Sequence, residues 1–87
     1  MPGPGRREGT HYEVVEGRAI IVDASGTELI TLNRVGTVVW ESLDGGRDVN
    51  ALTDEVATRF PDVARDELGR DVRQFLAELG RAKLIQG

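Results

Sequence analysis

Residues 29–46 read Leu-Ile-Thr-Leu-Asn-Arg-Val-Gly-Thr-Val-Val-Trp-Glu-Ser-Leu-Asp-Gly-Gly and change from one kind of secondary structure to another. The first four residues are apolar or β-branched, which is typical of a strand. Asn33 follows, and asparagine is favoured at the N-cap of a helix. Apolar residues then recur at helical spacing until Leu43, and Gly45-Gly46 ends the helix. The stretch therefore predicts a strand over residues 27–32 joined directly to a helix over residues 34–43.

Two strand-like segments precede this joint, over residues 12–16 and 18–23. The connections are short turns, at Gly17 and at residues 23–26, so the three strands are predicted to form an antiparallel meander. Residues 20–22 and 29–30 are consecutive apolar residues, whereas a sheet covered by helices on one face needs them only on that face. Either the core is irregular and leaves some apolar side chains exposed, or a partner completes part of the sheet.

Helical patterns follow the joint. Asp48 is a suitable N-cap for a helix from residue 49 to residue 59 or 60, which Pro61 ends. A third helix is expected from residue 63 or 64 to residue 82, with Asp62 as its cap and residues 84–85 as an extended tail. Three strands followed by three helices predict an α+β domain. The short turn between the last two helices is compatible with a helix-turn-helix.

The first residues differ in composition from the rest of the chain. Residues 1–9 contain three glycines and two prolines, which favour neither a helix nor a central strand. The sequence therefore predicts a disordered N-terminal tail over residues 1–10 and one folded domain over residues 11–87.

The residues that enzymes use are scarce in this chain of 87 residues. There are no cysteines, which excludes a disulfide scaffold, a thiolate metal site and a cysteine nucleophile. His11 stands alone at the edge of the tail, and Ser25 and Ser42 lack a nucleophile motif. We therefore predict a protein that is not an enzyme and has no catalytic residues, no metal site and no cofactor.

The charge and the hydropathy limit the partners. The net charge is −4, and the first half of the third helix carries several carboxylates, which repel a phosphate backbone. Nucleic acid is therefore not predicted as a partner, and a DNA-binding winged helix-turn-helix domain is kept as the alternative function. No apolar run approaches the ~20 residues of a membrane span, and the start is not a signal peptide. We expect no membrane partner and a cytoplasmic location.

Three motifs stand out along the chain: Leu32-Asn33-x-x-Gly36-x-x-x-Trp40-x-x-Leu43-Asp44-Gly45, then Val49-x-x-Leu52, then Asp71-Val72-x-x-Phe75-Leu76-x-x-Leu79 followed by Leu84-Ile85. Together they resemble the PqqD family, the leader-recognition domains of ribosomally made, post-translationally modified peptides. The resemblance covers about residues 18–85 and departs at Ala82-Lys83, where the family usually has a glycine. It implies a winged helix-turn-helix with a three-stranded sheet packed on three helices.

The resemblance also implies a function. The leader of a precursor peptide would bind as an extra strand beside the third strand, in the cleft bounded by the third helix. The module would then deliver the precursor to a separate tailoring enzyme. That partner is a radical SAM enzyme for PqqD itself, or a leader peptidase and a macrocyclase in lasso-peptide pathways.

The implied peptide-binding residues lie on two elements. An exposed strand edge offers unpaired N–H and C=O groups that an extended peptide can satisfy. On the third helix, apolar residues would wall the pocket and polar residues would line its rim, although a core-only role for Val72, Phe75 and Leu79 fits the same spacing. The predicted site is the edge Glu28, Leu29, Ile30, Thr31 and Leu32, the walls Val72, Phe75, Leu76 and Leu79, and the rim Asp71, Arg73 and Gln74.

Overall fold

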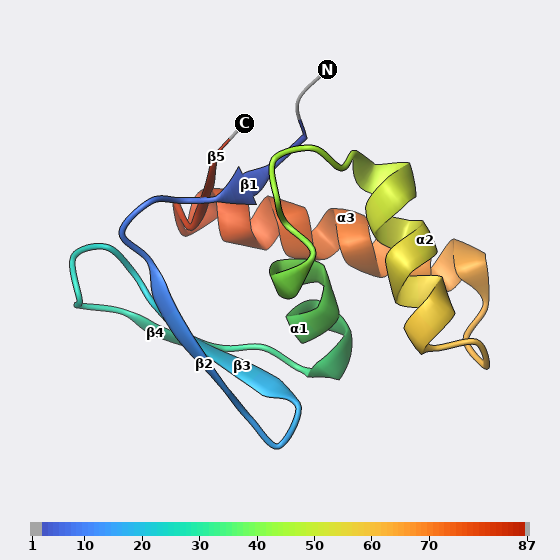
Figure 1. Cartoon of the computed structure of the whole chain (residues 1–87), viewed down its shortest axis with the longest axis horizontal. Helices are drawn as coiled ribbons and strands as arrows, with labels where there is room; N and C mark the ends of the chain where they lie inside the picture. The colour runs from blue at the N-terminus through green and yellow to red at the C-terminus, as the bar shows by residue number, and fades with distance from the viewer. Residues whose placement is uncertain (1–2, 87) are drawn as a thin grey trace.

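The computed structural model describes residues 3–86, which form an α+β domain with a three-stranded antiparallel sheet followed by three helices (Figure 1). This confirms the fold class predicted from the sequence. A separate two-stranded pairing joins the two ends of the described chain. In chain order the elements are β1 (Gly5–Arg6), β2 (His11–Val15), β3 (Arg18–Val22), β4 (Leu29–Thr31), α1 (Arg34–Glu41), α2 (Val49–Arg59), α3 (Arg65–Arg81) and β5 (Ile85–Gln86).

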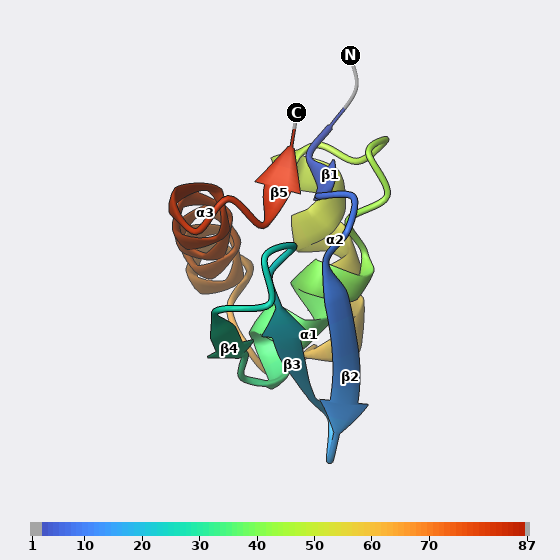
Figure 2. The ribbon, with the colours of Figure 1, turned by 90° about the vertical axis from the view of Figure 1, so that its left-hand side faces the viewer.

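The sheet is the meander β2-β3-β4, with β4 on the side of α3 and β2 on the far side (Figure 2). In the first hairpin, Glu16 and Gly17 have positive φ values of 53° and 79°, as a two-residue turn of type I′ requires. In the second, the Asp23 side chain accepts hydrogen bonds from the backbone N–H groups of Thr27 (2.9 Å) and Glu28 (3.2 Å). This turn fixes where β4 begins.

The core lies between the inner face of the sheet and the helices, with α1 in the middle (Figure 1). Trp40 of α1 is fully buried, and its ring meets the Tyr12 ring of β2 edge-on, with 5.7 Å between the centroids. Burial of such large side chains is the main favourable term in folding. The other buried apolar residues are Ala19, Ile21, Leu32, Val39, Leu43, Leu52, Val56, Leu68, Val72, Leu79 and Leu84.

The strand-to-helix joint is built by Asn33 and Thr37. Asn33 caps α1, because its side-chain oxygen accepts a hydrogen bond from the Gly36 N–H at 2.8 Å. The Thr37 hydroxyl donates to the Asn33 carbonyl (2.8 Å) and accepts from the Ala19 N–H (2.7 Å). Thr37 therefore ties α1 to β3 and satisfies a buried strand donor. The cap predicted at Asn33 is confirmed.

The N-terminal segment differs from the predicted disordered tail. Residues 5–6 form β1, which pairs with β5 so that Gly5 lies opposite Gln86 and Arg6 opposite Ile85. The Arg6 guanidinium also donates to the Tyr12 hydroxyl at 2.9 Å. Glycine-rich composition does not prevent a short edge pairing with a segment some 80 residues away, and local sequence cannot reveal such a pairing. Residues 1–2 of the predicted tail lie outside the described residues.

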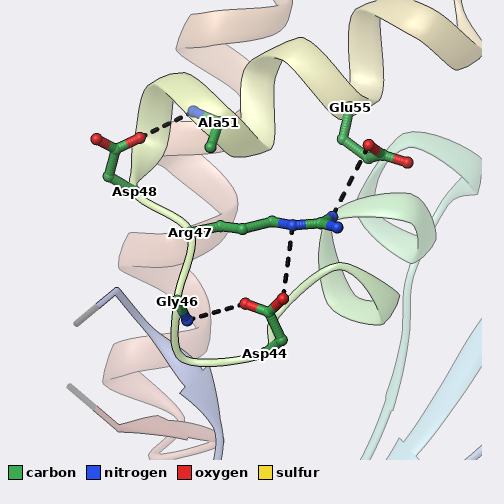
Figure 3. Close-up of polar contacts among 6 residues, drawn as sticks. All are labelled: Asp44, Gly46, Arg47, Asp48, Ala51 and Glu55. Atoms are coloured by element: carbon green, nitrogen blue, oxygen red, sulfur yellow. Dashed lines mark hydrogen bonds and ion pairs between the residues drawn. The ribbon is translucent and has the colours of Figure 1, made fainter.

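The connection between α1 and α2 is held by polar contacts (Figure 3). Arg47 lies between two carboxylates, with its Nε 3.6 Å from the Asp44 Oδ2 and its Nη1 3.8 Å from the Glu55 Oε2. The Asp48 side chain accepts from the Ala51 N–H at 2.9 Å, which confirms the predicted cap of α2. Gly45 has a φ of 83°, a left-handed conformation that favours glycine.

The start of α3 lies later than the sequence predicted. The helix begins at Arg65, its N-cap is Ala64, and no side chain caps it. The predicted cap Asp62 lies in a turn instead, where the Val63 N–H donates to the Phe60 carbonyl at 3.2 Å. The turn after Pro61 thus uses the residues that would have formed the first helical turn.

Candidate functional site

The edge of β4 is open. β4 stands at the end of the sheet, with β3 beside it on one side only among the described residues. The Leu32 N–H donates to the Ala19 carbonyl (2.8 Å) and the Asp23 N–H to the Glu28 carbonyl (3.2 Å), so residues 28, 30 and 32 direct their backbone groups toward β3. Because hydrogen bonding alternates along an antiparallel pair, the N–H and C=O groups of Leu29 and Thr31 point to the open side.

A cleft of about 460 Å³ lies beside this edge. Its walls come from β4, from the start of α1 and from one face of α3. The cleft is lined by Arg18, Ile30, Thr31, Leu32, Asn33, Val35, Asp71, Gln74, Phe75 and Glu78. The structure therefore brings together Ile30, Thr31 and Leu32 with Asp71, Gln74 and Phe75, half of the twelve residues predicted for the site.

The α3 side of the cleft is one helical face. Asp71, Gln74, Phe75 and Glu78 are three or four residues apart, so they stack on the same side of the helix. The Gln74 side-chain amide donates to the Glu78 carboxylate at 3.3 Å. The rim of this wall is therefore acidic, whereas Phe75 supplies an apolar surface.

Gly36 of α1 determines where the Phe75 ring lies. A Cβ atom built on Gly36 would approach the Phe75 Cε1 to 2.5 Å, closer than real Cβ contacts occur. Phe75 is partly buried, packs against the core and also lines the cleft. The absence of a side chain at Gly36 thus leaves room for the Phe75 ring of α3 beside the cleft.

The other predicted α3 residues lie elsewhere. Val72 and Leu79 are 0% and 2% exposed, so the core alternative holds for these two. Leu76 is partly buried against the core and does not line the cleft. Arg73 faces a groove between α2 and α3 together with Arg65 and Arg70.

The remaining edge residues flank the cleft. Leu29 is 68% exposed, on the outer face of the sheet beside Ile20 and Val22. By the register, Leu29, Ile20 and Val22 point to the outer face of the sheet, whereas Ile21 points inward. The sheet therefore carries apolar residues on both faces, as the sequence indicated. Glu28 lines a second hollow beyond the start of β4, with Arg81 and Lys83.

Four cleft residues were not predicted: Arg18, Asn33, Val35 and Glu78. Helical spacing could have found Glu78, which follows Gln74 by four positions and Asp71 by seven. Arg18 enters through the register of β3 and β4, and its Nε donates to the Leu32 carbonyl at 3.3 Å. No signal in the sequence marks such a contact between strands.

Within residues 3–86, no cluster of histidines and carboxylates is arranged to hold a metal ion. The helices of this part of the chain are all too short or too polar to span a bilayer.

Known proteins resemble this chain in sequence and in fold. A family model described as coenzyme PQQ synthesis protein D (PqqD) matches residues 18–85. Two relatives named PqqA binding protein, from Pseudomonas fluorescens strains Pf-5 and SBW25, are 36% and 34% identical over 80 residues, which span 92% of this chain and 80% and 85% of theirs. The solved structure of TbiB1 in complex with the TbiA(beta) leader peptide has a TM-score of 0.81 at 20% identity and 95% coverage of both chains, which shows a shared fold. The chain belongs to the PqqD family.

Proposed function

We propose that this chain recognises the leader of a ribosomally made precursor peptide, which adds as a strand to the open edge of β4 and lies in the cleft between β4 and α3. One observation carries the proposal: the unpaired backbone groups of Leu29 and Thr31 lie beside a cleft with apolar walls at Ile30, Val35 and Phe75. The relatives named PqqA binding protein support it, as does the similar structure that contains a leader peptide.

Strand addition combines affinity and selectivity. Each backbone hydrogen bond contributes about 0.5–1.5 kcal/mol whatever the peptide sequence. Side chains alternate along an added strand, so every second leader residue enters the cleft and meets Phe75 and the acidic rim. The remaining leader side chains lie on the outer face, near Leu29.

The site binds and does not catalyse. The leader-bound module delivers its precursor to a separate tailoring enzyme in the cytoplasm, either a radical SAM enzyme or a lasso-type leader peptidase with its macrocyclase. DNA binding by a winged helix-turn-helix is disfavoured because the cleft face of α3 carries two carboxylates, half-buried Asp71 and exposed Glu78.

The test is a proline at the open edge. Thr31→Pro removes an N–H that points away from β3 and leaves the β3–β4 hydrogen bonds in place. With the fluorescently labelled synthetic leader of the precursor encoded beside this gene, anisotropy should show an affinity about tenfold weaker, the equivalent of one lost hydrogen bond. In the unsubstituted protein, leader-induced amide shift changes should be confined to residues 28–32 and α3.

The matched control is Val14→Pro. The Val14 N–H also points away from β3, but on the opposite edge of the sheet, which lies away from α3 (Figure 2). We expect leader affinity to be unchanged in this variant. Equal losses in the two variants, or no loss in Thr31→Pro, would contradict strand addition at β4.

A further inference from the structure

We propose that the second hollow, named here the basic end pocket, binds an acidic side chain of the leader. This inference rests on the proposed function and assigns the leader a chemical feature. The pocket lies where α3 ends and β4 begins. It is lined by Arg7, Asp23, Ala24, Ser25, Glu28, Arg81, Ala82 and Lys83.

The basic end pocket continues the cleft along the same two elements. Glu28 immediately precedes β4, and Arg81 follows the cleft residue Glu78 by three positions, on the same side of α3. The turn between β3 and β4 lies toward the C-terminal end of α3 (Figure 1). A strand added to β4 therefore passes the cleft and then the basic end pocket.

The spacing between the two hollows can be estimated from helix geometry. Phe75 and Ala82 are seven residues apart in sequence, which corresponds to about 10 Å along a helix axis. An extended strand covers that distance in about three residues. Because side chains alternate along a strand, the acidic side chain should stand two or four residues from the leader side chain that meets Phe75.

The charges favour an anionic ligand. The pocket holds three cationic side chains, Arg7, Arg81 and Lys83, and each is exposed. None of these three forms an ion pair within residues 3–86. The two carboxylates, Asp23 and Glu28, leave the pocket a net charge of +1, and Asp23 is already engaged by its own turn. Hydrogen bonds from the Ser25 hydroxyl and then the Glu28 N–H lower the pKa of Asp23. Asp23 therefore stays ionised, and its carboxylate oxygens accept hydrogen bonds within the turn.

The backbone conformation of Lys83 independently indicates that its side chain has a role in the pocket. It has a φ of 59°, and it occupies the residue after the C-cap of α3. The Lys83 N–H donates to the Gly80 carbonyl (3.1 Å) and the Leu84 N–H to the Leu79 carbonyl (2.9 Å), the two bonds of a Schellman motif. Glycine adopts this conformation without strain, and lysine does not. Since the backbone favours glycine here, we assign the side chain a role in the pocket it lines.

The experiment compares the unsubstituted chain with Lys83→Gly. Glycine suits the backbone at this position, so the variant should fold at least as well while it loses one pocket cation. A display library of random twelve-residue peptides is selected on each protein. The unsubstituted chain should enrich Asp or Glu two or four residues from an apolar position, and Lys83→Gly should lose much of that enrichment.

A selected peptide then gives the size of the effect. Replacing its acidic residue by the corresponding amide should weaken binding to the unsubstituted chain about threefold to fivefold at low salt, as expected for an exposed ion pair. The difference should shrink for Lys83→Gly and persist for Lys83→Arg. Arg70→Gln, which removes an exposed cation facing the α2–α3 groove, is the control and should leave the selection unchanged.

The outcomes separate this inference from the proposed function. Peptides that compete with the leader for the β4 edge but show no acidic preference would overturn the basic end pocket alone. The same conclusion would follow if Lys83→Gly kept the full preference. Failure to enrich any peptide on a correctly folded chain would overturn the proposed function together with this inference.

Discussion

The two faces of α3 show how one helix serves both the core and the cleft. Val72 and Leu79 are buried in the core, while their sequence neighbours Asp71 and Glu78 line the cleft. Phe75 belongs to both, since it packs against the core and also lines the cleft. A shift of one residue rotates a helical side chain by about 100°, so adjacent positions reach different surroundings. The cleft is therefore lined by residues at the border of the buried stripe of α3, and not by the stripe itself.

Leu79→Ala tests the core face and should have the largest effect. Leu79 is 2% exposed, and removing a buried leucine side chain costs about 2–5 kcal/mol of unfolding free energy. Urea denaturation measures that loss. Leader affinity, measured at a temperature where the variant is still folded, should be unchanged because Leu79 does not line the cleft.

One result would contradict the assignment of Leu79 to the core face. If Leu79→Ala weakened leader binding in the folded protein with little loss of stability, Leu79 would be a pocket wall rather than a core residue. The amide spectrum of the variant distinguishes a folded protein with altered affinity from partial unfolding.

Gly36→Ala tests Phe75, the α3 residue that belongs to both faces, because Gly36 of α1 lies against the Phe75 ring. The new methyl group would force the Phe75 ring to move, since the two would lie 2.5 Å apart. Overpacking costs about 1–3 kcal/mol, which the better helix propensity of alanine offsets by about 1 kcal/mol. We expect a net loss of up to about 2 kcal/mol in urea denaturation. Leader affinity should also fall, because a displaced ring narrows the cleft.

Gly80→Ala is the matched control for this change. Gly80 is also helical, but a Cβ atom there would meet nothing within 4 Å. The free energy of unfolding of Gly80→Ala should rise by up to about 1 kcal/mol, and its leader affinity should be unchanged. Adding Phe75→Leu to Gly36→Ala should recover part of the lost stability. An unchanged leader affinity in Gly36→Ala would show that Gly36 does not position the ring for binding.

The sequence predicted the elements well because their signals are local. Asn33 and Asp48 cap helices as expected, and helical spacing identified Val72 and Leu79 as one stripe. The same spacing could not separate core from cleft. That distinction depends on which strand faces each side of α3, and the position of a strand relative to a helix is set by contacts distant in sequence.

Two of the features that the sequence missed depend on distant partners. β1 forms where residues 5–6 pair with residues 85–86, although its glycine-rich composition suggests a tail. Arg18 reaches the cleft through strand register. The Lys83 position was visible as a departure from the family pattern, but only the positive φ shows that the backbone there favours glycine.

Glu78→Gln tests the polar side of the comparison and should have the smallest effect. Glu78 is exposed and accepts a hydrogen bond from Gln74, so its replacement should change stability by less than about 0.5 kcal/mol. If the leader is acidic near this end of α3, Glu78 repels it. The substitution should then raise leader affinity by up to about threefold in low salt, and the gain should vanish in high salt because exposed charges are screened.

Glu67→Gln, an exposed change in the first turn of α3 outside the cleft, should leave affinity unchanged. Anisotropy titrations at two salt concentrations measure both variants. A salt-dependent loss of affinity in Glu78→Gln would instead mean that the acidic rim pairs with a basic leader residue. The cleft and the basic end pocket would then bind leader side chains of opposite charge.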